Sequence, residues 1–175
     1  CAPQPDEALA VIEEVCREQG APLSLIGRDW TWQPGAFDLE GQHLTVRHEA
    51  GAAPPLEDAW MPLLGEHQLV NAATAVAAIW EAGLRLAPDA LRRGLGAIQW
   101  PGRLEILSRE PLLVADSAHN GDSARKLMAA LERHCPNRRL ILLLGGSADH
   151  ATPELFRALL PSASRAIATR SRHPR

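Results

Sequence analysis

An acid and an imidazole follow a short apolar run, in the order Leu-Val-Ala-Asp-Ser-Ala-His-Asn over residues 113–120. The run predicts a strand that ends at Asp116, and the apolar periodicity after Asn120 predicts a helix. Ligands of α/β sheets usually lie where strands end and helices begin, because free backbone N–H groups there attract anionic and polar groups. We therefore expect Asp116 and His119 to contact a ligand.

The rest of the sequence disfavours other chemistry at this stretch. Asp116 and His119 would suit a metal pair, but the remaining histidines are scattered and complete no recognised ligand set. Ser117 and His119 are too close on one bend for a catalytic triad, and no Gly-x-Ser-x-Gly element is present, so a hydrolase is not expected. The Gly-Gly-Ser at 145–147 is a weak nucleotide signal, and a tight strand exit is an equal alternative.

A second polar cluster opens a helix that Gly83 ends. His67, Gln68 and Asn71 fall in its first turns, where unpaired N–H groups and the positive end of the helix dipole favour an anionic or carbonyl-bearing ligand. The alternative is that Gln68 and Asn71 only cap or solvate the helix start.

Residues 100–103, Trp-Pro-Gly-Arg, mark a domain boundary. Adjacent Pro and Gly cannot continue a helix, and the pattern afterwards changes to strand, helix, strand, helix, strand. We therefore predict a first domain over residues 1–100 and a second over 101–175. Arg103 is the one cation at the junction, and it either clamps a phosphate bidentately or joins the two domains by a salt bridge.

Periodicity, Gly and Pro predict the elements that position these residues in the first domain. We expect an amphipathic packing helix over residues 5–19 and a short helix over 88–96. Between residues 22 and 50 the apolar period is two, and the runs are separated by Gly27, Pro34-Gly35 and Gly41-Gln42, which predicts short antiparallel strands. Residues 51–55 form a connector, and a further strand is expected near 56–60.

The second domain is predicted to be Rossmann-like. Strands are expected over residues 104–108, 112–115, 140–144 and 163–168, with helices over 120–133 and 153–160. The continuous aliphatic run at 140–144 is typical of a strand buried on both faces in a parallel sheet. The alternation predicts an α/β fold with a doubly wound sheet.

Composition disfavours several classes of function. The 175 residues, 46% hydrophobic and 22% charged, indicate a globular chain, and the net charge of −3 disfavours a nucleic-acid partner. The longest apolar runs are far below the roughly 20 residues that cross a bilayer, and no secretion signal begins the chain, so we expect a cytoplasmic protein without a membrane partner.

The three cysteines lack a Cys-x-x-Cys spacing, which favours reduced thiols. The only lysine, Lys126, lies outside any P-loop motif.

Three motifs occur in a specific order: Leu-Gly-Glu-His-Gln-Leu-Val-Asn-Ala at 64–72, Trp-Pro-Gly-Arg-Leu-Glu at 100–105 and Asp-Ser-Ala-His-Asn at 116–120. Together they resemble the folylpolyglutamate synthase and dihydrofolate synthase family of the Mur ligases, and residues 169–175 are similar to a further loop of that family. Those enzymes use ATP to convert a folate or pteroate carboxylate into an acyl phosphate, which the amine of glutamate attacks. The resemblance implies a ligase with ATP, L-glutamate and folate or dihydropteroate as substrates.

The resemblance also implies roles for four residues. Asn71 would contact the base, Arg103 the phosphates and Asp116 the ribose of ATP, and His119 would be catalytic, beside the nucleotide or the incoming glutamate. The P-loop, the Mg²⁺ ligands and the modified lysine of the family would lie upstream. The chain would then comprise the end of the ATP-binding domain and most of a truncated Rossmann-like C-terminal domain, and we expect it to be inactive alone.

Two kinds of alternative remain open. A peptidoglycan-building amino-acid ligase shares Pro-Gly-Arg and an element like Asp-x-Ala-His-Asn, although His67-Gln68 and residues 171–175 favour folate. The chain would otherwise be a non-catalytic module that binds nucleotide or a partner, or a structural fragment without a ligand. One departure from the family concerns the glycine-rich loop, where His150 follows Asp149 in place of the family's lysine.

Overall fold

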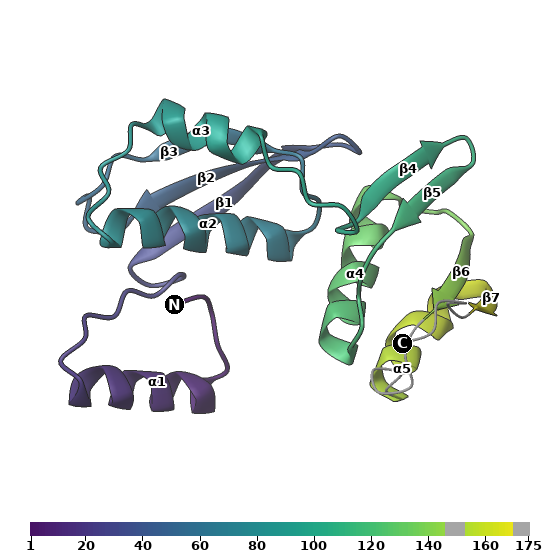
Figure 1. The fold of residues 1–175 in the computed structure, drawn as a ribbon, viewed down its shortest axis with the longest axis horizontal. Coiled ribbons are helices and arrows are strands. Elements are labelled where there is room, and N and C mark those ends of the chain that lie inside the picture. Colours follow the sequence, from purple (N-terminus) through teal and green to yellow (C-terminus); the bar gives the residue numbers. More distant parts are fainter. Residues whose placement is uncertain (146–152, 170–175) are drawn as a thin grey trace, which may run out of the picture. The chain divides into compact units, whose positions relative to one another are not determined.

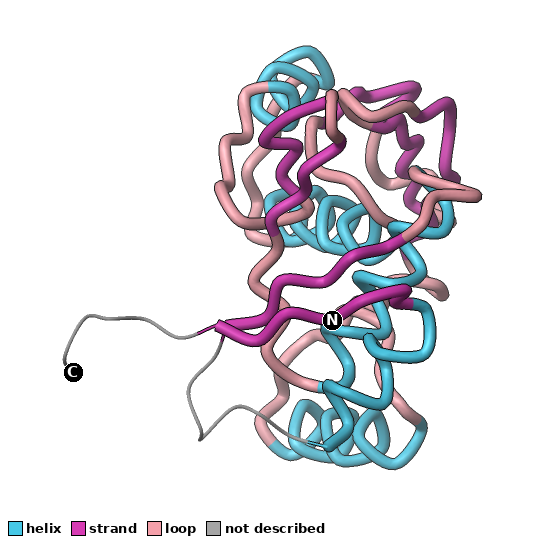
Figure 2. Tube along the Cα trace, turned by 90° about the vertical axis from the view of Figure 1, so that its right-hand side faces the viewer, coloured by secondary structure: helices cyan, strands magenta, loops and turns pink. Residues whose placement is uncertain are grey.

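A computed structural model describes residues 1–145 and 153–169 of the chain. Two compact units divide the chain, Cys1–Gln99 and Trp100–Arg175, which we call unit 1 and unit 2 and describe separately. Helices and strands are both present in each unit, so the predicted α/β class is confirmed (Figures 1 and 2). The predictions for the loop after Gly145 and for residues 171–175 lie outside the described residues.

Unit 1 contains a three-stranded antiparallel sheet in the order β1-β2-β3 (Figure 1). Its elements are α1 (Asp6–Glu18), β1 (Trp30–Phe37), β2 (Gln42–His48), β3 (Leu56–Met61), α2 (Glu66–Glu81) and α3 (Pro88–Gly96). The expected helices and the strand near residues 56–60 are confirmed to within about two residues at each end, the ordinary uncertainty of a helix boundary.

The predicted break at Pro34-Gly35 is wrong. Strand β1 continues through both residues, and its register with β2 shifts between Pro34 and Phe37, so the extra residues form a bulge. Proline is tolerated there because β1 is an edge strand of its sheet and the missing N–H interrupts no central ladder.

The core of unit 1 lies between the sheet and α2. Leu44 and Ala59 from the sheet and Leu69 from α2 have no exposed surface. Trp30 at the start of β1 is 1% exposed, and its indole Nε1 donates a hydrogen bond to Oε1 of Glu81 at 2.9 Å. The last residue of α2 therefore satisfies a polar group that the core has buried.

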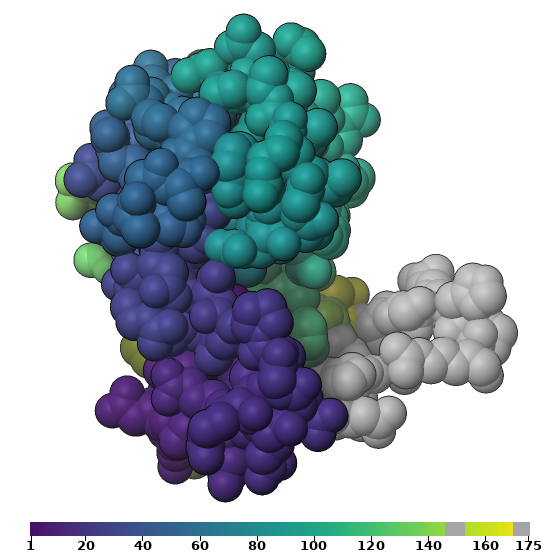
Figure 3. All heavy atoms as spheres, turned by 90° about the vertical axis from the view of Figure 1, so that its left-hand side faces the viewer, coloured from purple at the N-terminus to yellow at the C-terminus, as the bar shows by residue number. Residues whose placement is uncertain are grey.

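The first helix forms as predicted, but the described residues do not cover its apolar face. No residue of α1 is buried, and Val11 and Val15 of its apolar face are 59% and 50% exposed. Figure 3 shows α1, in purple, at the surface. The amphipathic pattern produced the predicted helix without the predicted burial.

Unit 2 contains an antiparallel hairpin and a parallel pair of strands. Its elements are β4 (Glu105–Arg109), β5 (Leu112–Ala115), α4 (Gly121–His134), β6 (Leu140–Gly145), α5 (Pro153–Leu159), a 3₁₀ turn (Leu160–Ser162) and β7 (Ala163–Thr169). Strands β6 and β7 are parallel and α5 lies between them in sequence, which is the βαβ unit of an α/β fold.

Strand β6 is covered on one face only. Leu142 packs with Ala124 of α4 and Leu159 of α5 in the small core of this unit. Ile141 and Leu143 on the other face are 52% and 69% exposed. The parallel pairing is confirmed, whereas burial of both faces is wrong for the described residues.

Gly41→Ala is expected to destabilise unit 1 by about 1–3 kcal/mol, because a core position without spare volume resists an added methyl group. An ideal Cβ at Gly41 would lie 2.5 Å from the Met61 carbonyl oxygen and 2.6 Å from Nε1 of Trp60. Urea unfolding of the purified chain, followed by circular dichroism, measures the change.

The matched control is Gly94→Ala in α3, where no heavy atom lies within 4 Å of the added Cβ. It is expected to stabilise the chain by about 0.5–1 kcal/mol, because alanine loses less backbone entropy than glycine in a helix. Equal effects of the two substitutions would contradict this account of Gly41.

The stability of unit 1 is expected to fall in acid partly through Glu81. Hydrogen bonds from Trp30 and Ser24 lower the pKa of Glu81, and the charges of His48 and Arg85 lower it further against the opposing effect of desolvation. The charged carboxylate therefore stabilises the fold at pH values above the ordinary glutamate pKa. That contribution is lost as the pH falls through the lowered pKa of the folded state.

Glu81→Gln keeps an acceptor oxygen but cannot titrate. Between pH 7 and pH 3 the variant is expected to lose less unfolding free energy than the wild-type chain in urea titrations. Parallel losses in the two proteins would show that Glu81 does not carry this dependence.

Candidate functional site

Backbone hydrogen bonds bring Arg103 and Asp116 together in unit 2. The Leu104 amide donates to Oδ2 of Asp116 at 2.8 Å, and the Ser117 amide donates to the Gly102 carbonyl at 2.9 Å. The segment just before β4 is thereby joined to the segment just after β5. Arg103, predicted to contact the phosphates, and Asp116, predicted to contact the ribose, therefore lie in one local structure.

This junction has an unusual backbone. Gly102 has a φ of +73°, and Leu104 has a φ of +46°, although leucine carries a Cβ that disfavours this region. Such a conformation costs about 1–3 kcal/mol and persists only when its surroundings fix it. Here the Leu104 side chain is buried and its amide is held by Asp116.

The guanidinium of Arg103 contacts two side chains of unit 2. Its Cζ is 5.8 Å from the centre of the Trp100 ring, and Nη1 donates to the hydroxyl of Ser117. Within the described part of unit 2, no carboxylate lies within ion-pair distance of it. A guanidinium has five N–H donors, and the others are available to an anion.

The Asp116 carboxylate accepts two backbone hydrogen bonds. Besides the bond from Leu104, the Ala118 amide donates to Oδ1 at 2.7 Å. A carboxylate offers about four lone-pair positions, so two positions remain for hydroxyl donors of a ligand. The residue is exposed, and a ligand therefore has access to it.

His119 lies just before α4, next to the N-cap residue Asn120. Its Nδ1 is 3.1 Å from the Ser117 carbonyl oxygen, which can only accept; in the tautomer that makes this hydrogen bond, Nδ1 donates and Nε2 is the basic nitrogen. The following residue, Asn120, forms a reciprocal capping box with Ser123. The imidazole therefore stands at the positive end of a well-capped helix.

Asn71 lies in unit 1, whereas the other three candidate residues lie in unit 2. Its side-chain amide donates to Oε1 of the buried Gln68 at 3.1 Å, and Nε2 of Gln68 is 3.2 Å from Nε2 of His67. The N-cap of α2 is Gly65, and no side chain caps the helix. Gln68 and Asn71 therefore do not cap the helix, whereas the exposed Asn71, held by Gln68, remains compatible with solvation of the helix start.

Gln42 is a residue that the sequence reasoning missed, because Gly41-Gln42 was interpreted as a break between strands. Its side chain is 1% exposed and donates to the carbonyls of Leu63 and Gly65, in the loop before α2. The available signal was the period of two along the strand, which places Gln42 on the same face as the apolar Leu44 and Val46.

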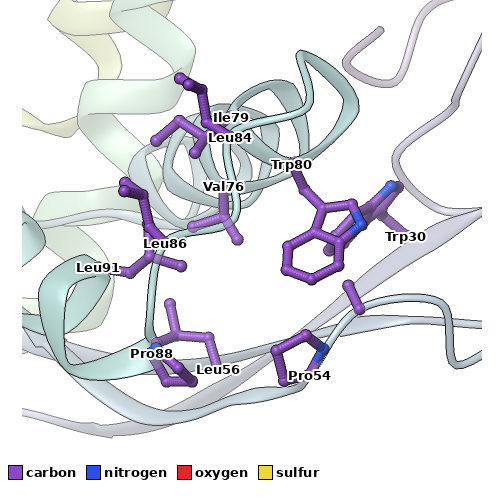
Figure 4. Close-up of a pocket in the computed structure, with 11 residues that line it drawn as sticks. Trp30, Pro54, Leu56, Val76, Ile79, Trp80, Leu84, Leu86, Pro88 and Leu91 are labelled. Atoms are coloured by element: carbon purple, nitrogen blue, oxygen red, sulfur yellow. The ribbon is translucent and has the colours of Figure 1, made fainter.

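An apolar pocket lies in unit 1, toward the other end of α2 (Figure 4). Val76 and Trp80 line it, and along the helix axis Val76 is roughly 8 Å from Asn71. The remaining lining residues are Trp30, Ala53, Pro54, Leu56, Ile79, Leu84, Leu86, Pro88 and Leu91. The lining holds no charged side chain, so the pocket is not a candidate phosphate site.

Within residues 1–145 and 153–169, no three His, Cys, Asp or Glu side chains gather in a way that could hold a metal ion. The helices of the same described part are all too short or too polar to cross a membrane.

Comparison with known proteins assigns the chain to a family. Residues 102–175 match the family described as Mur ligase, glutamate ligase domain. The chain is 34% identical over 131 residues to folylpolyglutamate synthase of Lacticaseibacillus casei, which covers 73% of the chain and 30% of that protein. It is 30% identical over 139 residues to dihydrofolate synthase/folylpolyglutamate synthase of Escherichia coli strain K12, which covers 79% of the chain and 30% of that protein.

The fold agrees with these likenesses. A solved structure of Mycobacterium tuberculosis folylpolyglutamate synthase complexed with ADP superposes with a TM-score of 0.89 at 27% identity, over 99% of this chain and 38% of that one. The chain spans about a third of the length of the curated relatives named above. The resemblance carried by the three motifs is confirmed: the chain belongs to the folylpolyglutamate synthase and dihydrofolate synthase family of the Mur ligases.

Proposed function

We propose that the chain is part of an ATP-dependent ligase that adds L-glutamate to a folate or to dihydropteroate. The observation that carries this proposal is the junction in unit 2, where backbone hydrogen bonds hold Arg103 beside Asp116 and His119 follows just before α4. An arginine, a carboxylate and a helix N-terminus in one place suit a nucleotide. The ADP bound by the Mycobacterium tuberculosis relative supports nucleotide use.

The proposed reaction needs little covalent chemistry from the protein. ATP transfers its γ-phosphoryl group to the substrate carboxylate, the amine of glutamate attacks the acyl phosphate, and inorganic phosphate leaves. Phosphoryl transfer of this kind depends on positioning and on charge neutralisation. The N–H groups of Arg103 not engaged by Ser117 suit phosphate oxygens, and the remaining lone pairs of Asp116 suit the ribose hydroxyls.

Two further residues complete the proposal. Asn71 donates one of its two amide N–H groups to Gln68, and we assign its oxygen to a donor on the base. The basic Nε2 of His119 suits it to receive a proton from the amine of glutamate. The family also implies Mg²⁺, but the described residues contain no ligand set for it, and we assign none of them to the metal. Since ATP is supplied in the cytoplasm, we place the reaction there.

The experiment that tests the function supplies the full-length protein with ATP, Mg²⁺ and L-glutamate. We expect ADP release that depends on folate or dihydropteroate, together with a product that mass spectrometry shows to carry an added glutamate. The 175-residue chain alone is expected to give neither. Glutamate addition to a UDP-muramoyl peptide, and none to folate or dihydropteroate, would instead support a peptidoglycan ligase, and nucleotide binding without any product would support a non-catalytic module.

Arg103→Ala in the full-length protein is expected to lower turnover about a hundredfold, the usual effect of removing a charged donor from a developing negative charge. Arg103→Lys is expected to fall between the wild type and Arg103→Ala, because lysine keeps the charge but not the planar fork. Steady-state kinetics and thermal unfolding of the same preparations separate catalysis from folding.

The matched control for Arg103 is Arg157→Ala. Among the described residues, the sole ion-pair partner of Arg157 is the exposed Glu154 on the surface of α5, at 3.3 Å. Such surface pairs contribute little to stability, and both turnover and melting temperature should stay near the wild-type values. If Arg103→Ala behaves like this control, the phosphate assignment is wrong.

A further inference from the structure

The side chain of Gln42 fixes the loop that leads into α2. Its Nε2 donates to the Leu63 carbonyl at 2.7 Å and to the Gly65 carbonyl at 2.9 Å. Strand β3 ends at Met61 and α2 begins at Glu66, so both carbonyls belong to the connecting loop. Gln42, whose exposed fraction is 1%, thus donates to two carbonyls that have no partner in the strand ladder.

Gly65 connects this contact to α2. It is the N-cap of the helix, with a φ of +100°, and its carbonyl also accepts from the Gln68 amide at 3.0 Å. Oε1 of Gln68 in turn accepts from Nδ2 of Asn71 at 3.1 Å. A series of contacts therefore runs from the buried strand residue to the exposed amide of Asn71, with hydrogen bonds on either side of the covalent side chain of Gln68.

We propose that Gln42 is a positioning residue for Asn71 and thereby sets the preference of the site for an adenine nucleotide. The inference rests on the proposed function, in which Asn71 contacts the base. One of its two N–H groups is donated to Gln68, which orients the Asn71 amide, and the inference assigns its oxygen to accept from the 6-amino group of adenine. Inosine carries an acceptor at that position, so a displaced Asn71 loses the distinction between ATP and ITP.

A purely structural role for Gln42 predicts a different result. Contacts to the base lie away from the reacting phosphate and act equally on the bound substrate and the transition state, so their loss raises KM and leaves kcat unchanged. A smaller folded fraction instead lowers the apparent kcat for every nucleotide by the same factor. The ratio of kcat/KM for ATP and ITP is therefore insensitive to the amount of folded protein.

The test is Gln42→Met in the full-length protein, because methionine fills nearly the same volume and donates no hydrogen bond. We expect KM for ATP to rise about tenfold with an unchanged kcat, and the preference for ATP over ITP to fall by a similar factor. The matched control is Val46→Ala, which weakens the same face of β2 without touching the loop. Its preference should equal that of the wild type.

A double-mutant cycle with Asn71→Ala completes the test. If Gln42 acts through Asn71, then adding Gln42→Met to Asn71→Ala lowers the preference no further. Additive losses, or a wild-type preference in Gln42→Met, overturn the inference.

A second variant covers the case in which Gln42→Met does not fold. Gln68→Met breaks the same series of contacts one step later and is expected to lower the preference likewise, and an unchanged preference there overturns the inference. A different pattern marks failure of the proposed function itself: a wild-type protein without ligase activity, or an Asn71→Ala variant that keeps the full preference.

Discussion

Backbone amides and carbonyls in a strand-to-helix loop have no ladder partner, and this constraint governs both candidate regions. In unit 1 the Gln42 amide pairs the carbonyls before α2, and in unit 2 the Asp116 carboxylate pairs the amide of Ala118 before α4 as well as the amide of Leu104 before β4. The loop before α2 has carbonyls that require a donor, and the loop before α4 has an amide that requires an acceptor. Each side chain comes from an adjoining strand end, so the sheets fix where the two helices begin.

Asp116 shows how a structural and a binding role share one side chain. Two backbone N–H groups stabilise its charged form in place, and the same bonds bring Arg103 next to it through Gly102 and Leu104. The positive φ of Leu104 is the conformational cost of that arrangement. A purely structural turn at this position would more commonly place glycine there, which avoids the strain.

The sequence predicted the helices well, because their ends have local causes. Gly20 and Gly83 follow the ends of α1 and α2, and Pro88 lies at the first position of α3. Motif order predicted the family, and it named Arg103 and Asp116, which the structure places together. Gln42 was missed because its partners lie more than 20 residues away in sequence. A glutamine after a glycine looks locally like a turn, and only the fold shows which carbonyls it reaches.

The errors in predicted burial have one physical origin. The apolar pattern of a segment indicates how much apolar surface the segment has to bury in its final environment. It does not indicate how much of that surface the neighbouring segments of the same chain can cover. Strand β6 is aliphatic on both faces, yet α4 and α5 supply only enough apolar surface for the face that contains Leu142. The residues on its other face, like Val11 and Val15 of α1, stay exposed. The pattern therefore predicted whether each element is a helix or a strand. How many faces of an element are buried depends on its packing partners, which periodicity alone does not specify.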